Sequence, residues 1–168
     1  MRRYYYFIIA SLLVSLFIYL FYRTEKTVVN EIAIRIISFN SYVTVKKAII
    51  RFLPLNEVVI YSLPEGLWVF CITLTSKPYY IQYKFRQINC VVIPLLFSVG
   101  LEMCQLLHFT NGRFDPIDIV VSLFFWLMAT LSFNEKSSDK QNILTPLNRG
   151  RMVCFLNYGV VYLSHVLE

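Results

Sequence analysis

Two groups of polar residues lie at helical spacing on either side of a short connection within apolar sequence. They are Ser98, Glu102 and Gln105, at positions i, i+4 and i+7, and Asp115, Asp118 and Ser122, at positions i, i+3 and i+7. Residues with these spacings share one face of a helix. Because only residues 108–114 connect the two predicted helices, we expect antiparallel neighbours whose polar faces meet near Arg113.

The ionisable side chains of this set are the ones suited to chemistry. A central Asp, Lys or Arg in a spanning helix costs roughly 2.5–3.5 kcal/mol on insertion scales, so an ionisable residue there is a functional candidate by default. We assign Glu102 and Asp118 as candidate catalytic residues, each acting as a base or a cation ligand. The candidate substrate-binding residues are Gln105, Arg113 and Asp115, and the guanidinium of Arg113 suits a phosphate group.

The same residues also have structural interpretations, which the sequence leaves open. Asp115 precedes Pro116, and this order is favourable for a helix N-cap followed by proline at the first helical position. Asp118 would then lie in the first turn, where negative charge suits the helix dipole. Glu102 and Gln105 could pair with Arg113 to tie the two helices together.

Four cysteines are scattered through the chain, in or beside apolar segments, and form no C-x-x-C pair. They are Cys71, Cys90, Cys104 and Cys154. This spacing does not indicate a disulfide framework or a zinc site. From the sequence we predict neither a metal site nor a cofactor.

The elements that must position the polar residues are long apolar segments. The chain of 168 residues is 57% hydrophobic and 15% charged, against about 25% charged residues in a typical soluble domain. Apolar stretches of about 20 residues match the thickness of a bilayer. We predict an all-α, polytopic transmembrane helical bundle of about 4–5 spans, forming a single domain over residues 1–168. The approximate spans are residues 4–22, 58–76, 88–107, 116–133 and 152–167.

Two of these segments allow alternatives. Ser62-Leu63-Pro64-Glu65 resembles a capping box with proline in the first turn, which predicts that a helix begins near Leu63. The alternative is a helix that begins near Val58 and bends at Pro64. Residues 152–167 form either a short fifth span or a surface helix.

The region around the first span indicates how the chain enters the membrane. Residues 4–22 end in Tyr-Leu-Phe-Tyr rather than in small residues, so we predict a retained span and not a cleaved signal peptide. In the following extramembrane segment, Val45, Ala48, Ile49 and Phe52 recur at helical spacing, opposite Lys46, Lys47 and Arg51. This pattern fits a basic amphipathic helix in the headgroup region or an ordinary extramembrane helix. The distribution of basic residues favours a cytoplasmic N-terminus.

The net charge of +6 does not indicate a nucleic-acid partner. The basic residues flank the apolar segments or lie in loops, where a membrane protein meets anionic lipid headgroups. We therefore predict membrane lipids as partners and no nucleic acid.

Residues 100–119, GLEMCQLLHFTNGRFDPIDI, resemble the signature of VanZ-like membrane proteins. In that family E-x-x-Q at a helix end precedes a short loop with R-x-D-x-x-D, and the matching residues here are Glu102, Gln105, Arg113, Asp115 and Asp118. Ser122 stands where the family usually has asparagine, and Phe124-Phe125-Trp126 replace small residues, as in a divergent or inactive member. The resemblance implies a multi-pass protein of the bacterial cytoplasmic membrane. The founding member is associated with low-level teicoplanin resistance.

Three functions are compatible with these features. The first is a small envelope protein that binds or modifies a lipid or a lipid-linked cell-surface precursor at the polar cluster. The second is a non-enzymatic subunit or scaffold that uses the aromatic residues 124–126 to bind a partner membrane protein. The third, a transporter, has less support because the sequence shows no inverted repeat. The sequence does not decide whether a reaction is catalysed.

Overall fold

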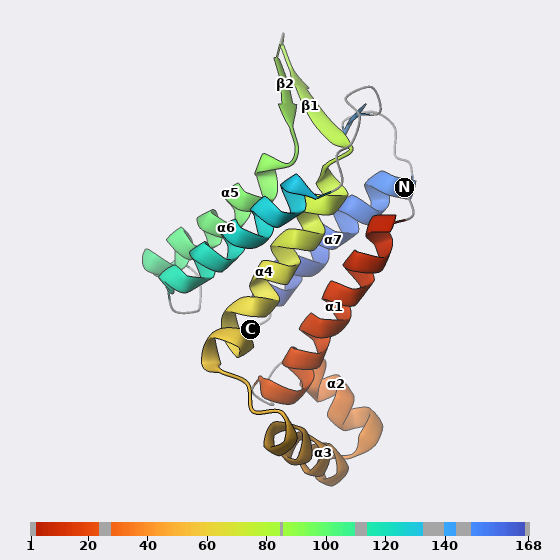
Figure 1. Ribbon diagram of the computed structural model, residues 1–168, viewed down its shortest axis with the longest axis vertical. Coiled ribbons are helices and arrows are strands. Elements are labelled where there is room, and N and C mark those ends of the chain that lie inside the picture. The colour runs from red at the N-terminus through yellow and green to blue at the C-terminus, as the bar shows by residue number, and fades with distance from the viewer. Residues whose placement is uncertain are drawn as a thin grey trace.

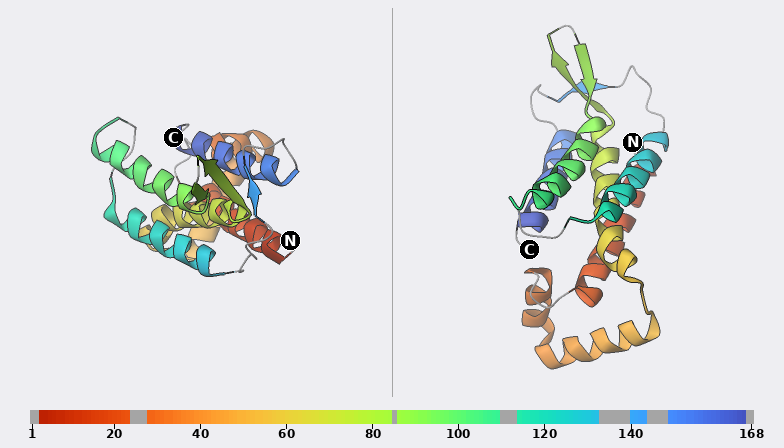
Figure 2. Two further views of the ribbon diagram at one scale, coloured as in Figure 1. Left: turned by 90° about the horizontal axis from the view of Figure 1, so that it is seen from above. Right: turned by 90° about the vertical axis from the view of Figure 1, so that its left-hand side faces the viewer.

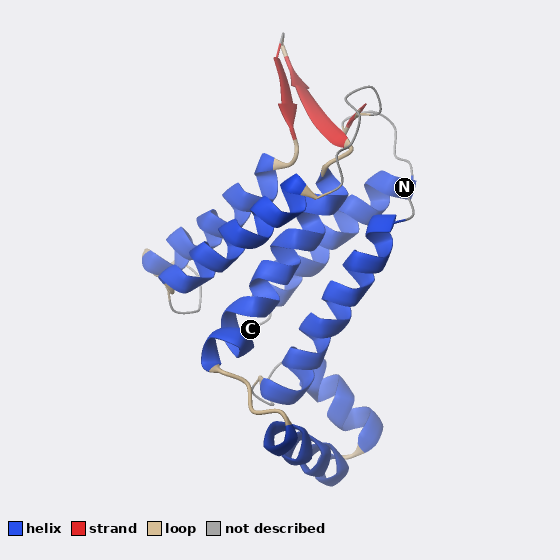
Figure 3. Ribbon diagram, viewed as in Figure 1, coloured by secondary structure: helices blue, strands red, loops and turns tan. Residues whose placement is uncertain are grey.

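The computed structural model describes residues 3–23, 28–84, 86–109, 114–132, 140–143 and 149–166. Within these ranges the chain is mostly helical, with seven helices and three short strands (Figures 1 and 3). The elements are α1 (Arg3–Tyr22), α2 (Val28–Ile37), α3 (Phe39–Phe52), α4 (Glu57–Ser76), β1 (Tyr79–Tyr83), β2 (Arg86–Asn89), α5 (Val92–Leu106), α6 (Pro116–Leu131), β3 (Gln141–Asn142) and α7 (Arg149–Val166). The predicted helical bundle is confirmed in this coarse form.

Helix α4 is the central element of the bundle. It packs against α1, α5, α6 and α7, as the views from the front and from above show (Figures 1 and 2). The main core cluster joins α1, α4 and α6 and consists of Ile8, Phe70, Cys71, Leu74 and Ala129. Every other long helix is therefore positioned relative to α4.

Two features of α4 fix its contact with α6. At Gly66 the helices approach so closely that a Cβ atom would lie 2.7 Å from Val121 and 2.4 Å from Phe125. At the far end, the Nζ of buried Lys77 donates hydrogen bonds to the carbonyl oxygens of Ala129, at 2.8 Å, Thr130, at 3.0 Å, and Ser132. A cation at a helix C-terminus satisfies carbonyl groups that have no partner within the helix.

The start of α4 corrects one prediction and agrees with the starting point of its alternative. The helix begins at Glu57, close to Val58, and Pro64 lies inside it and is fully buried. The capping box predicted from Ser62 to Glu65 is therefore wrong. Tertiary packing of this segment outweighs the hydrogen bond that proline removes, a balance that apolar helices commonly reach.

A small sheet at one end of the bundle was not predicted. β1 and β2 form an antiparallel hairpin, and β3 pairs with β1 in parallel through Tyr79↔Gln141 and Tyr80↔Asn142 (Figure 3). Because residues 86–89 are taken up by β2, the helix predicted over residues 88–107 begins only at Val92. The aromatic and β-branched residues of the hairpin favour strands as much as a membrane interface.

Among the residues that the structure describes, two helices are long and apolar enough to cross a membrane, namely Tyr5–Tyr22 in α1 and Glu57–Ser76 in α4. Helices α5 and α6 are apolar but have only 15 and 16 residues. At 1.5 Å per residue they extend roughly 22–24 Å, less than a hydrocarbon core of about 30 Å. Four to five spans therefore remain a prediction.

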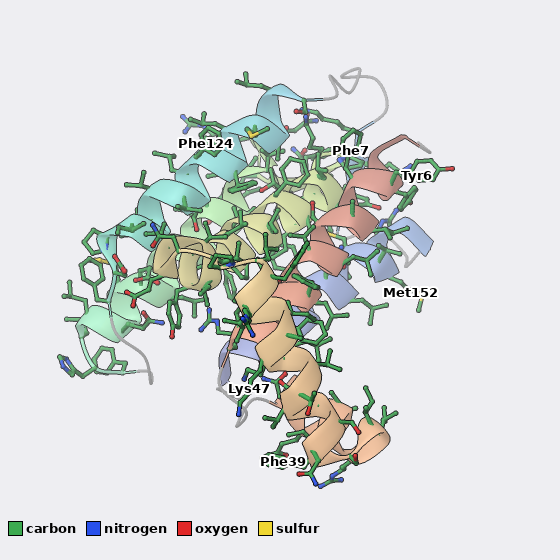
Figure 4. The ribbon with its side chains drawn as sticks, turned by 60° about the horizontal axis from the view of Figure 1, so that its bottom comes forward. Tyr6, Phe7, Phe39, Lys47, Phe124 and Met152 are labelled. Carbon is green, nitrogen blue, oxygen red and sulfur yellow. The ribbon has the colours of Figure 1, made fainter. Side chains whose placement is uncertain are left out.

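Helices α2 and α3 lie at the opposite end of the bundle from the sheet (Figure 1). They are tied to the end of α1, where the Tyr42 hydroxyl donates to the Leu20 carbonyl at 2.5 Å and Lys46 Nζ donates to the Arg23 carbonyl at 2.9 Å. Phe39 and Lys47 lie on the outside of this pair (Figure 4). The predicted helix at Val45 to Phe52 is confirmed as the second half of α3.

Gly66→Ala should destabilise the protein, and Gly100→Ala provides the matched control. Alanine favours a helix by about 1 kcal/mol over glycine, but overpacking at a close contact costs about 1–3 kcal/mol. A Cβ atom at Gly100 would meet nothing within 4 Å, so there only the gain applies. Thermal unfolding of both variants in the same detergent should give a lower Tm for Gly66→Ala only. Equal shifts would contradict the close approach of α4 and α6.

Candidate functional site

Three carboxylates meet where α4, α5 and α6 come together. They belong to Glu65, Glu102 and Asp118, and one oxygen of each lies within 4.8 Å of those of the other two. Glu102 and Asp118 face each other across the α5–α6 hairpin, as the sequence predicted for antiparallel neighbours. The third carboxylate comes from the central helix, which the sequence did not place in the site.

The cluster is buried and held by hydrogen bonds. Glu102 is only 1% exposed, and its Oε2 accepts a hydrogen bond from the backbone N–H of Asp115 at 3.2 Å. The Ser98 hydroxyl, one turn before Glu102 on α5, donates to Glu65 Oε1 at 3.4 Å. These bonds link the start of α6 to α5, and α5 to α4.

Glu65 was missed because its local sequence imitates a helix start. In Ser62-Leu63-Pro64-Glu65 the glutamate fits the last position of a capping box, so it was given a structural role. The signal that identifies it is its position in the middle of an apolar helix long enough to cross a membrane. An ionisable residue in such a helix is a functional candidate.

The negative charges of the three carboxylates in the cluster require compensation. At an effective dielectric constant of about 20, two like charges roughly 5 Å apart repel by about 3 kcal/mol. Three ionised carboxylates at this separation therefore need protons or a cation among them. Arg23, at the end of α1, lies within electrostatic range of Glu65.

Arg23 is positioned by two tyrosines. Its guanidinium carbon is 5.0 Å from the ring centre of Tyr19 and 4.8 Å from that of Tyr61, and its Nη2 donates to the Tyr61 carbonyl at 3.2 Å. Tyr61 lies one turn before Glu65 on α4. In the sequence Arg23 is one of the basic residues that flank the apolar segments, whereas the structure places it near the acidic cluster.

The other predicted site residues have different outcomes. Asp115 is the N-cap of α6, its Oδ1 accepting from the Ile117 N–H at 2.9 Å, which confirms the structural interpretation. Gln105 is half-buried on α5, and no hydrogen bond joins its side chain to any residue in the described ranges. Arg113 lies outside the residues that the structure describes, so its predicted role is untested.

A buried hydroxyl lies directly behind the cluster on α6. Ser122 is one turn after Asp118 and is 0% exposed, and its Oγ has no hydrogen-bond partner among the described residues. One further turn on, Trp126 Nε1 donates to the Val91 carbonyl at the start of α5. Because Asp118, Ser122 and Trp126 share one helix face and Trp126 is bound to the start of α5, we infer that Ser122 also faces α5.

An apolar groove runs along the outside of α4 and α6 beside the cluster. It has a volume of about 320 Å³ and is lined by Val58, Val59, Leu63, Val120, Val121, Phe124 and Phe125. Val58 lies two turns before Glu65, and Val121 one turn after Asp118, so the groove and the carboxylates use neighbouring faces of the same two helices. Such a groove suits an apolar chain.

The aromatic residues expected to form one partner-binding face are divided in the structure. Phe124 is 57% exposed and points outward (Figure 4). Phe125 packs edge-on against Phe70, and Trp126 is bound to α5. Only Phe124 remains for an external contact.

Comparisons with known proteins identify no relative. No family model matches the chain, and no curated protein or solved structure is significantly similar to it. The function is therefore argued from the site and from the motif described above.

The N-cap role of Asp115 predicts a measurable stability difference. Asp115→Ala should lower the free energy of unfolding by about 1 kcal/mol, because the Ile117 N–H loses its acceptor. Asp115→Asn keeps the acceptor and should remain close to the wild type. Denaturant unfolding followed by circular dichroism measures both changes. A large loss in the asparagine variant would mean that the negative charge itself is needed.

Proposed function

We propose that this chain is a multi-pass protein of the bacterial cytoplasmic membrane that binds or modifies a lipid or lipid-linked cell-surface precursor at the carboxylate cluster. The observation that carries the proposal is the meeting of Glu65, Glu102 and Asp118 within apolar helices, beside an apolar groove. The carboxylates would act on the polar end of the molecule while its hydrocarbon chain occupies the groove.

The outer surface of the bundle supports a membrane location. The apolar window of α1 is only 17% buried by the rest of the chain. Large apolar side chains face outward from α1, α6 and α7, including Tyr6 at 76% exposure, Phe7, Phe124 and Met152 (Figure 4). Soluble monomers rarely expose contiguous apolar patches larger than a few hundred Å². A hydrocarbon surrounding accounts for a surface of this kind.

The resemblance to VanZ-like proteins gives additional support, and it rests on the motif alone. Within that motif, Glu102 and Asp118 lie close together, and Asp115 is the N-cap of α6. As roles, we propose Glu102 or Asp118 as the acid–base group or cation ligand, with Gln105 and Arg113 contacting the substrate. A link to teicoplanin resistance follows from the resemblance only.

The proposed membrane location predicts that the two ends of the bundle lie on opposite sides of the membrane. Helix α3 and the β1–β2 hairpin lie at opposite ends of the bundle (Figure 1), and Lys47 on α3 and Lys84 in the β1–β2 turn are both exposed. In a variant without native cysteines, Lys47→Cys should react with a membrane-impermeant maleimide on intact cells, and Lys84→Cys only after lysis. The protein should also stay in the membrane pellet after alkaline carbonate extraction. Release by carbonate would contradict the proposal.

The proposed site predicts a loss of function without a loss of protein. Glu102→Gln and Glu65→Gln are near-isosteric and keep an acceptor for the Asp115 N–H and the Ser98 hydroxyl. In a Gram-positive host that produces the protein, both variants should reach wild-type levels in the membrane. They should reduce growth in teicoplanin to that of cells with an empty vector.

The control for this experiment is Glu57→Gln, which removes an exposed carboxylate from the first turn of the same helix as Glu65. It should behave as the wild type. Full activity of Glu102→Gln would instead favour a non-enzymatic scaffold, for which exposed Phe124 is the available contact. Identical growth of wild-type and vector cells would exclude the glycopeptide link.

A further inference from the structure

We propose that Glu65, Glu102 and Asp118 hold one hard divalent cation, such as Mg²⁺, Mn²⁺ or Ca²⁺, which binds the phosphate oxygens of a lipid headgroup. This inference rests on the proposed function and specifies how its site works. It goes beyond the sequence analysis, which considered Glu102 or Asp118 as a cation ligand but predicted no metal site and did not include Glu65. Two observations support it, the geometry of the carboxylates and the buried hydroxyl of Ser122.

The first observation is the spacing of the three carboxylates. Their ligand oxygens lie within 4.8 Å of one another. Oxygens on opposite sides of one Ca²⁺ ion, each bound at about 2.4 Å, are about 4.8 Å apart, so this upper limit is compatible with one shared ion. The smaller Mg²⁺, bound at about 2.1 Å, would draw the oxygens closer together. An all-oxygen set of ligands favours Mg²⁺, Mn²⁺ or Ca²⁺ over zinc or copper.

The second observation is the buried hydroxyl behind the carboxylates. Ser122 is fully buried and shares the face of α6 that carries Asp118, yet its Oγ has no hydrogen-bond partner within the described part of the chain. Burying such a hydroxyl without a partner is unfavourable. A cation, or a water molecule bound to the cation, supplies the missing partner. The hydroxyl is thus a second observation, beside the acidic residues, that a ligand at this point would explain.

A cation also removes the repulsion between the three carboxylates and the phosphate group of a substrate. Three carboxylates repel a phosphate group, and Arg23 is the described cation placed near Glu65. A divalent ion compensates the cluster and keeps coordination positions open, since Mg²⁺ and Mn²⁺ commonly bind through a few carboxylates plus substrate phosphates. A phosphate on the polar end of a lipid is therefore the chemistry that the occupied site recognises.

The test uses the full-length protein, purified in detergent, stripped with a chelator and titrated with Mn²⁺ alone. Bound Mn²⁺ is measured by the loss of the free-ion electron paramagnetic resonance signal. The wild type should bind one ion per chain. Glu65→Gln, Glu102→Gln and Asp118→Asn should each weaken binding by more than about tenfold, because loss of a second-shell partner alone costs 10–100-fold. Ser122→Ala should weaken it by roughly tenfold.

Two controls separate ion binding from folding and from general negative charge. Glu57→Gln removes an exposed carboxylate from the first turn of α4, two turns before Glu65, and Mn²⁺ binding should be unchanged. In chelator, the three cluster variants should unfold at or above the wild-type temperature because they relieve repulsion between carboxylates. Absence of Mn²⁺ binding in the wild type would overturn the inference. Binding that survives Glu102→Gln, or falls equally in Glu57→Gln, would also overturn it.

Failure of this inference can be distinguished from failure of the proposed function. If the wild type binds no Mn²⁺ but Glu102→Gln still abolishes growth in teicoplanin, the cation is excluded and the carboxylates act by sharing protons. If Mn²⁺ binds as proposed but the cluster variants retain full activity in cells, the ion is structural and the proposed function fails.

Discussion

The close, parallel contact between α4 and α6 is the constraint on which the rest of the structure depends. It begins where Glu65 meets Asp118, continues at Gly66, and ends where Lys77 binds the last carbonyl groups of α6. The distance along the chain from Glu65 to Lys77 equals that from Asp118 to Thr130, so the two helices advance together. Gly66 permits the close approach of the two helices, and Lys77 fixes the far end of their contact. The position of the carboxylate cluster follows from this pairing.

The cluster combines two opposing requirements. Burial and mutual repulsion disfavour three charged carboxylates, whereas the hydrogen bonds from Ser98 and the Asp115 N–H hold two of them in place. A fold that needed only to be stable would replace such a group with apolar side chains. The retention of three acidic residues from three helices at one point is therefore better explained by a ligand or a reaction than by stability.

The predictive power of the sequence differed between local and long-range features. Helical spacing and a short connection were sufficient to place Glu102 opposite Asp118, and Asp115-Pro116 identified a helix N-cap, because these features depend on neighbouring residues. Glu65 could not be found in this way, since its partners lie 37 and 53 positions further along the chain. Its local motif also indicated a cap, and packing of α4 overrode that preference. The β1–β2 hairpin was missed because its tyrosines suit both a strand and a membrane interface.

The arrangement of charge and apolar surface around the cluster favours a substrate with a polar end and a hydrocarbon chain. The groove begins near the start of α4, where Arg23 is held between Tyr19 and Tyr61. The basic and apolar residues of α3 lie at the same end of the bundle. A free ion or sugar would need only the polar groups, and a passive lipid contact would need only the groove. Because neighbouring faces of α4 and α6 provide both, one amphipathic molecule explains them together more simply than two separate ligands.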